Sequence, residues 1–373
     1  MEKKSKLADA LLWESKKSFC RTVSFDLEAV EGRLLEKVQF GIEIDVPNFD
    51  YAKKVAVQSE ALGFDSIWIW DHFFWEGYRD PEAEQVADAL ECTTTMSALA
   101  ALTTRIRVGS LVMCNSYRSP SLTAKIAATL DVISNGRLEF GIGAGWKENE
   151  YLAYGFPFPK PAVRIAQLKE AVTIIRKMWT EEKPSFNGKY YEIKEALCEP
   201  KPVQKPHPPI WIGGSGEKLL LKVVAELADG WNWYGTPEEY AHKLDVLRDH
   251  CAKVGRDFDE IKKSWTGDLF LLPNGSNVKS DVEKYLESRR KYVKGVIVTR
   301  AREYDEYVHR NIVGTPDECR SKIREYMRLG ITRFYFEITT AKSRELFSKE
   351  VMPKFQGGQD CTAFESSSRN NKK

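Results

Sequence analysis

The chain has 373 residues, of which 56 are basic and 54 acidic, so its formal net charge is only +2. This length fits one large domain or two smaller ones, and the charge balance gives no overall field that would favour nucleic acid or an anionic membrane surface as a partner. The seven cysteines are an odd number without a CxxC pair, so we expect free thiols, no disulfide framework and no bound metal.

Short β-rich runs alternate with amphipathic helices in the first half of the chain. Apolar and β-branched residues predict strands over residues 38–44, 65–70, 106–113 and 137–142. Helical periodicity predicts helices over residues 50–62, 88–102, 120–133 and 163–179. Gly63 after the first helix and Asn135-Gly136 after the third are typical of helix ends.

The second half continues the alternation with two interruptions. Predicted strands cover residues 209–212, 230–234, 263–272 and 331–336, and predicted helices cover residues 217–227, 237–254, 316–329 and 343–354. Asn187-Gly188 between aromatic residues predicts a small β-hairpin. Residues 274–310 form a long excursion with a predicted helix at 281–292 and an apolar run at 295–299, and such an excursion can act as a lid.

Alternating strands and helices predict a mostly parallel sheet with helical crossovers. Seven or eight such units in about 320 residues fit a (β/α)8 TIM barrel with insertions, while a doubly wound sheet is the alternative. We predict the barrel over residues 37–355. Residues 1–36 are predicted to be an N-terminal extension, either helical or disordered, and residues 356–373 a disordered tail.

No segment has the pattern of a targeting signal or a membrane span. Residues 1–17 lack the apolar run and the cleavage site of a secretory signal. The most apolar stretch, residues 96–113, is interrupted by Arg105 and Arg107. We therefore expect a cytoplasmic protein.

Asp71-His72 stands immediately after the second predicted strand, and chemistry in a (β/α)8 barrel is located at that end of the strands. A carboxylate next to an imidazole can fix its tautomer and make it a usable acid or base. The alternative interpretation is a capping aspartate followed by a loop histidine.

Two glycine-rich loops follow the fourth and fifth predicted strands. The first, Gly141-Ile-Gly-Ala-Gly-Trp146, precedes the acidic residues Glu148 and Glu150, and the second, Gly213-Gly-Ser-Gly216, leads into the helix predicted at Glu217. Glycines let the backbone approach a ligand closely, and amides at a helix start favour an anion. A tight turn could explain either loop alone, but two on one barrel face predict a site for a phosphate and a ring.

Taken in order, the motifs of this chain resemble the luciferase-like monooxygenase superfamily, and within it the F420-dependent oxidoreductases. The similarity covers about residues 38–354. It is carried by Gly63-Phe-Asp-Ser-Ile-Trp68 with Asp71-His72, by residues 128–137, by Gly141–Trp146 with Glu150-Tyr151, and by residues 200–210, 213–217, 228–232 and 314–317.

The resemblance implies a barrel that holds the deazaflavin F420, or alternatively FMN, at the carboxyl ends of its strands. It places His72 beside the reactive part of the ring, with Asp71 orienting the ring or the histidine, and it puts a non-proline cis peptide at Ser110–Leu111. Trp75 lies near the family's active-site tryptophan position, with shorter spacing. The implied cofactor contacts are Asp71, Ser110, Leu111, Ala144, Gly145, Asn149, Gly213, Gly214, Ser215 and Gly216.

The function that this resemblance favours is hydride transfer between F420 and a small organic substrate. The first alternative is an FMN-dependent monooxygenase that uses reduced flavin and O2, and the second is a flavin-binding protein without turnover. Sugar-phosphate dehydrogenases of the family have a glutamate just after the glycine-rich turn, where this chain has Trp146, so we do not expect that chemistry. We also expect a homodimer or a higher homo-oligomer.

Overall fold

The computed structural model describes residues 37–74, 89–290, 304–337 and 340–356. Val38–Gly357 form one compact unit. The predicted N-terminal extension, residues 1–36, lies outside the described residues, as does the predicted tail beyond Gln356. Gln356 itself is the last residue of helix α14 (Pro353–Gln356).

Eight parallel strands form the barrel. They are β1 (Gln39–Glu43), β2 (Ser66–Ile69), β3 (Arg107–Ser110), β5 (Leu138–Gly143), β8 (Ile210–Gly213), β9 (Gly230–Trp233), β10 (Lys262–Gly267) and β13 (Arg333–Phe336). They pair in the order β3-β2-β1-β13-β10-β9-β8-β5, and a further pairing between β3 and β5 closes the sheet. A doubly wound sheet has open edges, so the closed pairing confirms the predicted (β/α)8 barrel and excludes the alternative.

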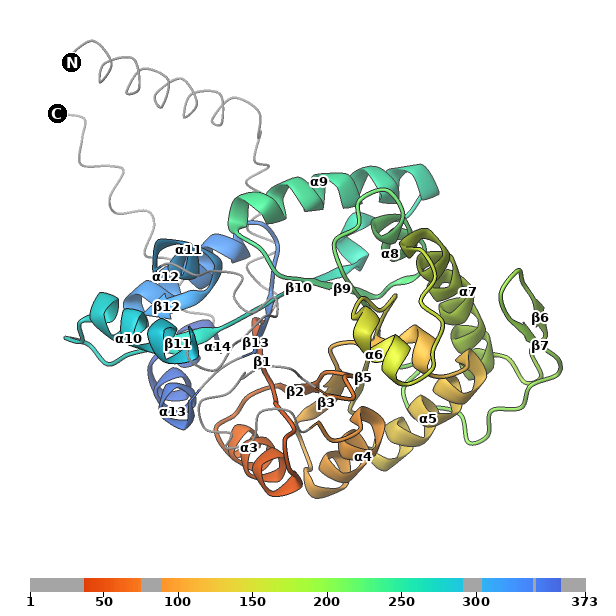
Figure 1. Cartoon of the computed structure of the whole chain (residues 1–373), viewed down its shortest axis with the longest axis horizontal. Helices are drawn as coiled ribbons and strands as arrows, with labels where there is room; N and C mark the ends of the chain where they lie inside the picture. Colours follow the sequence, from red (N-terminus) through yellow and green to blue (C-terminus); the bar gives the residue numbers. More distant parts are fainter. Residues whose placement is uncertain (1–36, 75–88, 291–303, 338–339, 357–373) are drawn as a thin grey trace, which may run out of the picture. The chain divides into compact units, whose positions relative to one another are not determined.

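Helices lie around these strands (Figure 1). They are α3 (Phe49–Ala61), α4 (Cys92–Leu102), α5 (Pro120–Ile133), α7 (Pro161–Thr180), α8 (Leu220–Leu227), α9 (Pro237–Val254), α12 (Pro316–Met327) and α13 (Ala341–Glu350). Local signals define their ends: Thr236 and Glu239 form a capping box at the start of α9, and Gly255 ends it with a φ of 67°. Among the described residues, no helix has the length and apolarity needed to cross a membrane.

Short elements interrupt the barrel. They are β4 (Met113–Cys114), η1 (Asn115–Tyr117), α6 (Glu148–Ala153), β6 (Phe186–Asn187), β7 (Glu192–Ile193), η2 (Phe258–Glu260), β11 (Leu269–Leu271), α10 (Val278–Arg290), α11 (Tyr304–Arg310) and β12 (Ile312–Gly314). Strands β6 and β7 form the predicted hairpin at Asn187-Gly188. In the excursion after β10, α10 and α11 pack through a small apolar cluster that includes Val282 and Tyr307. The predicted apolar run at 295–299 lies outside the described residues.

Two strands predicted as continuous are broken. Residues 106–113 divide into β3 and β4, which both pair with β5, around a turn at Leu111–Val112. Residues 263–272 divide at Asp268: β10 stays in the barrel, whereas β11 pairs with β12 in a separate sheet. Composition did not reveal the breaks because both halves of each run are largely buried.

Three large aromatic side chains pack together inside the barrel. Trp68, Trp211 and Tyr335 are nearly inaccessible and form one cluster, against which Leu111 packs. Glycines make room for them, since a Cβ at Gly41 would lie 2.9 Å from the Trp68 indole nitrogen. Gly109 and Gly230 likewise face the rings of Trp68 and Trp211. This packed layer closes the barrel below the carboxyl ends of the strands.

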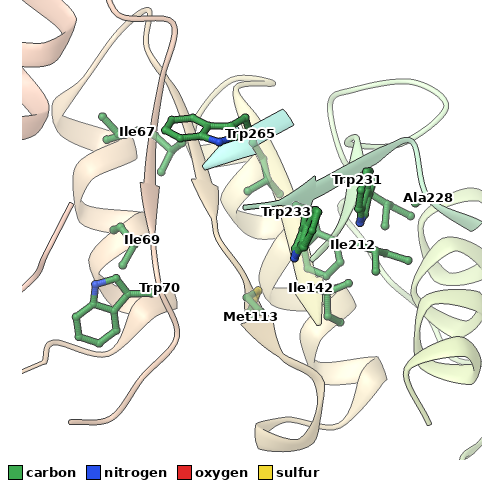
Figure 2. Packing of buried hydrophobic residues seen from close by; sticks show 14 of the residues in the cluster. Ile67, Ile69, Trp70, Met113, Ile142, Ile212, Ala228, Trp231, Trp233 and Trp265 are labelled. Atoms are coloured by element: carbon green, nitrogen blue, oxygen red, sulfur yellow. The ribbon is translucent and has the colours of Figure 1, made fainter. Parts of the chain in front are cut away.

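Outward-facing residues of the barrel strands pack beneath the helices. Trp231 and Trp233 of β9 stack with their ring centroids 6.0 Å apart. Figure 2 shows them beside Ile212 of β8 and Ile142 of β5. Because both faces of the sheet are buried, the sequences of its strands are apolar runs and do not alternate between apolar and polar residues.

We expect a variant that begins at Lys37 to fold, because all eight barrel strands lie within Val38–Gly357. Its melting temperature should stay within about 3 °C of the full chain, which corresponds to about 1 kcal/mol. A variant that begins at Phe64 is the matched control, since it lacks β1, which pairs with both β2 and β13. Loss of the folded protein on removal of residues 1–36 alone would contradict the predicted domain boundary.

Candidate active site

His72 lies just beyond the carboxyl end of β2, and a carboxylate from another element holds its ring. Its Nδ1 is 2.6 Å from Oε2 of Glu150, which is on α6. The Glu150 side chain is fully buried, whereas that of His72 is 15% exposed. Because Nδ1 is directed at the carboxylate, the Glu150 contact orients the imidazole ring and influences its tautomer.

The Glu150 carboxylate is held by four further groups. The backbone amides of Phe73 and Phe74 donate to its Oε1 over 2.8 and 3.3 Å, and the Tyr117 hydroxyl donates to its Oε2 over 3.2 Å. The Lys147 amine lies 3.7 Å from Oε1. Burial alone would raise the pKa of Glu150, but the hydrogen bond from His72 and the nearby charges outweigh it, so the pKa is lowered.

This lowered pKa predicts a pH dependence of stability. A carboxyl whose pKa falls on folding stabilises the folded state above its unfolded value of about 4.3, and that stabilisation is lost as the pH falls through the folded value. We therefore expect the free energy of unfolding to decrease below about pH 4.5. Chemical denaturation of the wild type and of Glu150→Gln over that range checks this, because the glutamine variant should show a weaker dependence. Equal slopes for the two proteins would contradict the contribution of Glu150.

Asp71 has a different partner from the predicted one. Its two carboxylate oxygens accept hydrogen bonds from the Arg118 guanidinium over 2.7 and 2.9 Å, and Oδ2 also accepts from the Cys114 amide over 2.9 Å. Arg118 bonds in addition to Glu91, the N-cap of α4. The expectation that Asp71 orients His72 is thus corrected: Glu150 contacts the imidazole, and Asp71 ties β2 to the segment after β4. Its role as a cofactor contact stays a prediction.

The cis peptide lies one residue later than predicted, at Leu111–Val112 instead of Ser110–Leu111. The Leu111 amide still donates to the Ile69 carbonyl over 2.9 Å, so the Ser110–Leu111 peptide continues the β2–β3 ladder. The Ser110 side chain is fully buried and donates to the Gly141 carbonyl. Strand β3 ends at Ser110, and the chain turns at Leu111–Val112.

Val112 lies against two strand ends that carry no side chain. A Cβ at Gly143 of β5 would be 2.8 Å from a Val112 methyl group, and one at Gly213 of β8 would be 3.0 Å away. The turn at Leu111–Val112 therefore rests close to the backbone of both strands. The turn and the two glycines form an apolar surface, and a flat ring could pack against it.

The rest of the first glycine-rich loop is fixed by α6. Gly145 has a φ of 74°, and a Cβ there would lie 1.8 Å from the Tyr151 hydroxyl, so only glycine fits. Ala144 is half-buried, whereas Trp146 and Asn149 are exposed. The carbonyl of Ala144 accepts from Tyr151. Cofactor contact by Ala144, Gly145 and Asn149 stays a prediction.

The second glycine-rich loop is anchored to β9. The Trp231 indole donates to the Gly214 carbonyl over 2.8 Å, and the Gly214 amide donates to the Asn232 carbonyl over 3.2 Å. Helix α8 begins at Leu220, three residues later than predicted, and Glu217 instead accepts hydrogen bonds from Lys243 and His242. The starts of α6, α7 and α8 have no side-chain cap, unlike the starts of α3, α4, α5 and α9. An anion bound by Gly213, Gly214, Ser215 and Gly216 would fit such a helix start.

The structure thus brings the predicted site segments to one end of the barrel, the carboxyl ends of β2, β3, β5 and β8. A family comparison agrees with this arrangement, since the luciferase-like monooxygenase model matches residues 23–333. The chain belongs to this family. It is therefore an oxidoreductase with a luciferase-like barrel.

Relatives in the family include enzymes named for each of the two cofactors. The chain is 29% identical over 324 residues to an F420-dependent glucose-6-phosphate dehydrogenase of Microbacterium testaceum, an alignment that covers 80% of this chain and 91% of that protein. It is 25% identical to an FMNH2-dependent dimethylsulfone monooxygenase of Pseudomonas putida, with coverage of 86% and 91%. An F420-dependent secondary alcohol dehydrogenase has a similar fold, with a TM-score of 0.72, 20% identity and coverage of 86% of this chain and all of that one.

Two residues of the site were not assigned a role from the sequence. In the sequence, Glu150 belongs to a family motif and Val112 to a predicted strand, and neither position indicates a role. The one available signal for Glu150 was its place after a glycine-rich loop at a strand end. Trp75, considered for the site, lies outside the described residues.

Proposed function

We propose that the chain is an F420-dependent oxidoreductase that transfers a hydride between the deazaflavin and a small organic substrate. The observation that carries the proposal is the combination, at one barrel end, of an imidazole held by a buried carboxylate, a glycine-lined apolar support and an uncapped helix start. When bound, F420 supplies a ring that accepts or donates a hydride. The larger identity to relatives named as F420-dependent supports this cofactor.

Each part of the site has a defined task in this proposal. The turn at Leu111–Val112, seated on Gly143 and Gly213, supports the ring of the cofactor. The amides of Gly213–Gly216 hold its phosphate. Glu150 orients the His72 ring through Nδ1, so that the imidazole can give a proton to the substrate or take one from it as the hydride moves.

FMN-dependent monooxygenation is the second candidate, favoured by the 25% identity to the Pseudomonas putida enzyme. The two candidates are distinguished by purifying the protein from a host that makes both cofactors, denaturing it, and recording the absorbance and mass of what is released. F420 in the supernatant supports the proposal, and FMN supports monooxygenation. Release of neither, together with no binding of either to the purified protein, would contradict both.

Gly216→Asp is expected to weaken cofactor binding about tenfold or more, because it places a carboxylate where the phosphate binds at the start of α8. The position tolerates a side chain, since a Cβ there would meet its nearest neighbour, the Cβ of Leu220, at 3.4 Å. Gly216→Ala is the matched control and should keep both its stability and its affinity for F420. Equilibrium titration of the wild type and the two variants with F420 checks this. Unchanged affinity in the aspartate variant would show that the phosphate does not bind at Gly216.

A further inference from the structure

One exposed aromatic ring lies directly beside His72, and a second exposed ring packs on the residues that follow it. Trp146, at the end of the β5 loop, is 55% exposed, and its ring contacts the His72 imidazole edge-on, with centroids 5.7 Å apart. Tyr154, at the end of α6, is 53% exposed and stacks on Phe73 at 4.1 Å. Phe74 lies 6.3 Å from the same tyrosine ring. We call Trp146, Tyr154, Phe73 and Phe74 the aromatic shelf.

Among the described residues, two cations near His72 are already bonded to protein groups. The Arg118 guanidinium bonds to Asp71 and Glu91. Lys147 is buried, and its amine donates to the Phe74 carbonyl over 2.8 Å. Together with Glu150, these described contacts contain three carboxylates and two cations. A phosphate dianion placed here would meet net negative charge and cations that are already engaged.

We infer that the substrate is a neutral, planar, unsaturated organic molecule that stacks on the aromatic shelf, and not a sugar phosphate. Exposed aromatic faces bind such molecules by contact area and ring stacking, and they need no cation to do so. The inference rests on the proposed function for the identity of the reaction. It separates this chain from its relatives named as glucose-6-phosphate dehydrogenases.

The test uses 2-naphthol, a neutral fluorescent probe, titrated into wild-type protein and three variants, with and without F420 or FMN. We expect binding to weaken about tenfold in Trp146→Ala and to stay within about threefold of wild type in Trp146→Phe, which keeps a ring. Leu152→Ala is the matched control, because Leu152 is 64% exposed on α6 outside the shelf, and its affinity should not change. Calorimetry with glucose 6-phosphate should detect no binding.

Naphthol binding that is absent, or that is equal in wild type and Trp146→Ala, would overturn the inference, and so would binding of glucose 6-phosphate at this site. Titration of the same proteins with F420 and FMN distinguishes failure of this inference from failure of the proposed function. If F420 and FMN both fail to bind while naphthol binding depends on Trp146, the inferred substrate site is supported and the proposed function is contradicted. If a cofactor binds but the binding of naphthol does not depend on Trp146, only the inferred substrate site is contradicted.

Discussion

His72→Ala is expected to lower turnover about a hundredfold or more, the usual contribution of a positioned general acid or base. The reason is the geometry at its ring: Glu150 fixes Nδ1, and the partly exposed imidazole lies at the mouth of the barrel beside Trp146. Cofactor affinity should change much less, because the loop Gly213–Gly216 belongs to β8 and α8. The rate per cofactor-loaded molecule is the quantity to measure.

His207→Ala is the matched control for this prediction. His207 precedes β8, at the opposite end of the barrel, where it packs against Trp179 and lies 3.8 Å from Asp229. Its loss should cost stability but leave the rate per folded molecule unchanged. If His72→Ala behaves in the same way, and also keeps the absorbance and fluorescence of the bound cofactor, His72 does not act in the active site.

Glu150→Ala should destabilise the fold by about 3–5 kcal/mol, the usual cost of removing one partner of a buried ion pair. The substitution would remove the carboxylate that accepts from the amides of Phe73 and Phe74 and lies 3.7 Å from the buried Lys147 amine. The His72 ring would also lose its anchor, so turnover should fall as well. Urea denaturation and the rate per folded molecule measure the two effects.

Glu150→Gln separates those effects, because it keeps the shape and an acceptor oxygen but removes the charge. It should lose less stability than the alanine variant and still show reduced turnover. An exposed neighbour on the same helix, Glu148, serves as the control, and Glu148→Ala should change neither quantity by much. Wild-type stability in Glu150→Ala would show that the carboxylate does not hold this region together.

Local patterns were sufficient to predict most of the barrel. Apolar runs and helix-end signals placed the eight strands and the helix Pro237–Val254, and Asn187-Gly188 placed the hairpin. The elements that were missed include α6, α11 and β12, which are short. None of the three carries enough periodicity to be recognised from the sequence.

The site was predicted less completely because its contacts join residues far apart in the chain. Asp71 is next to His72 in sequence, yet the carboxylate that contacts the imidazole comes from Glu150, 78 residues away. Asp71 is occupied by Arg118, a partner that spacing alone does not indicate. The start of α8 was predicted too early because Glu217 suits a first helical turn, whereas in the structure it bonds to Lys243 of the next helix.

The central claim is that the carboxyl end of this barrel is an F420 site, and equilibrium titration of the cofactor-free protein tests it most directly. F420 and FMN are titrated separately into the wild type, Gly216→Ala and Gly216→Asp. The structure and the relatives together predict saturable binding of F420 that is tighter than that of FMN and is weakened only in the aspartate variant. Failure of F420 to bind, or binding that is unaffected by Gly216→Asp and weaker than that of FMN, would contradict the claim.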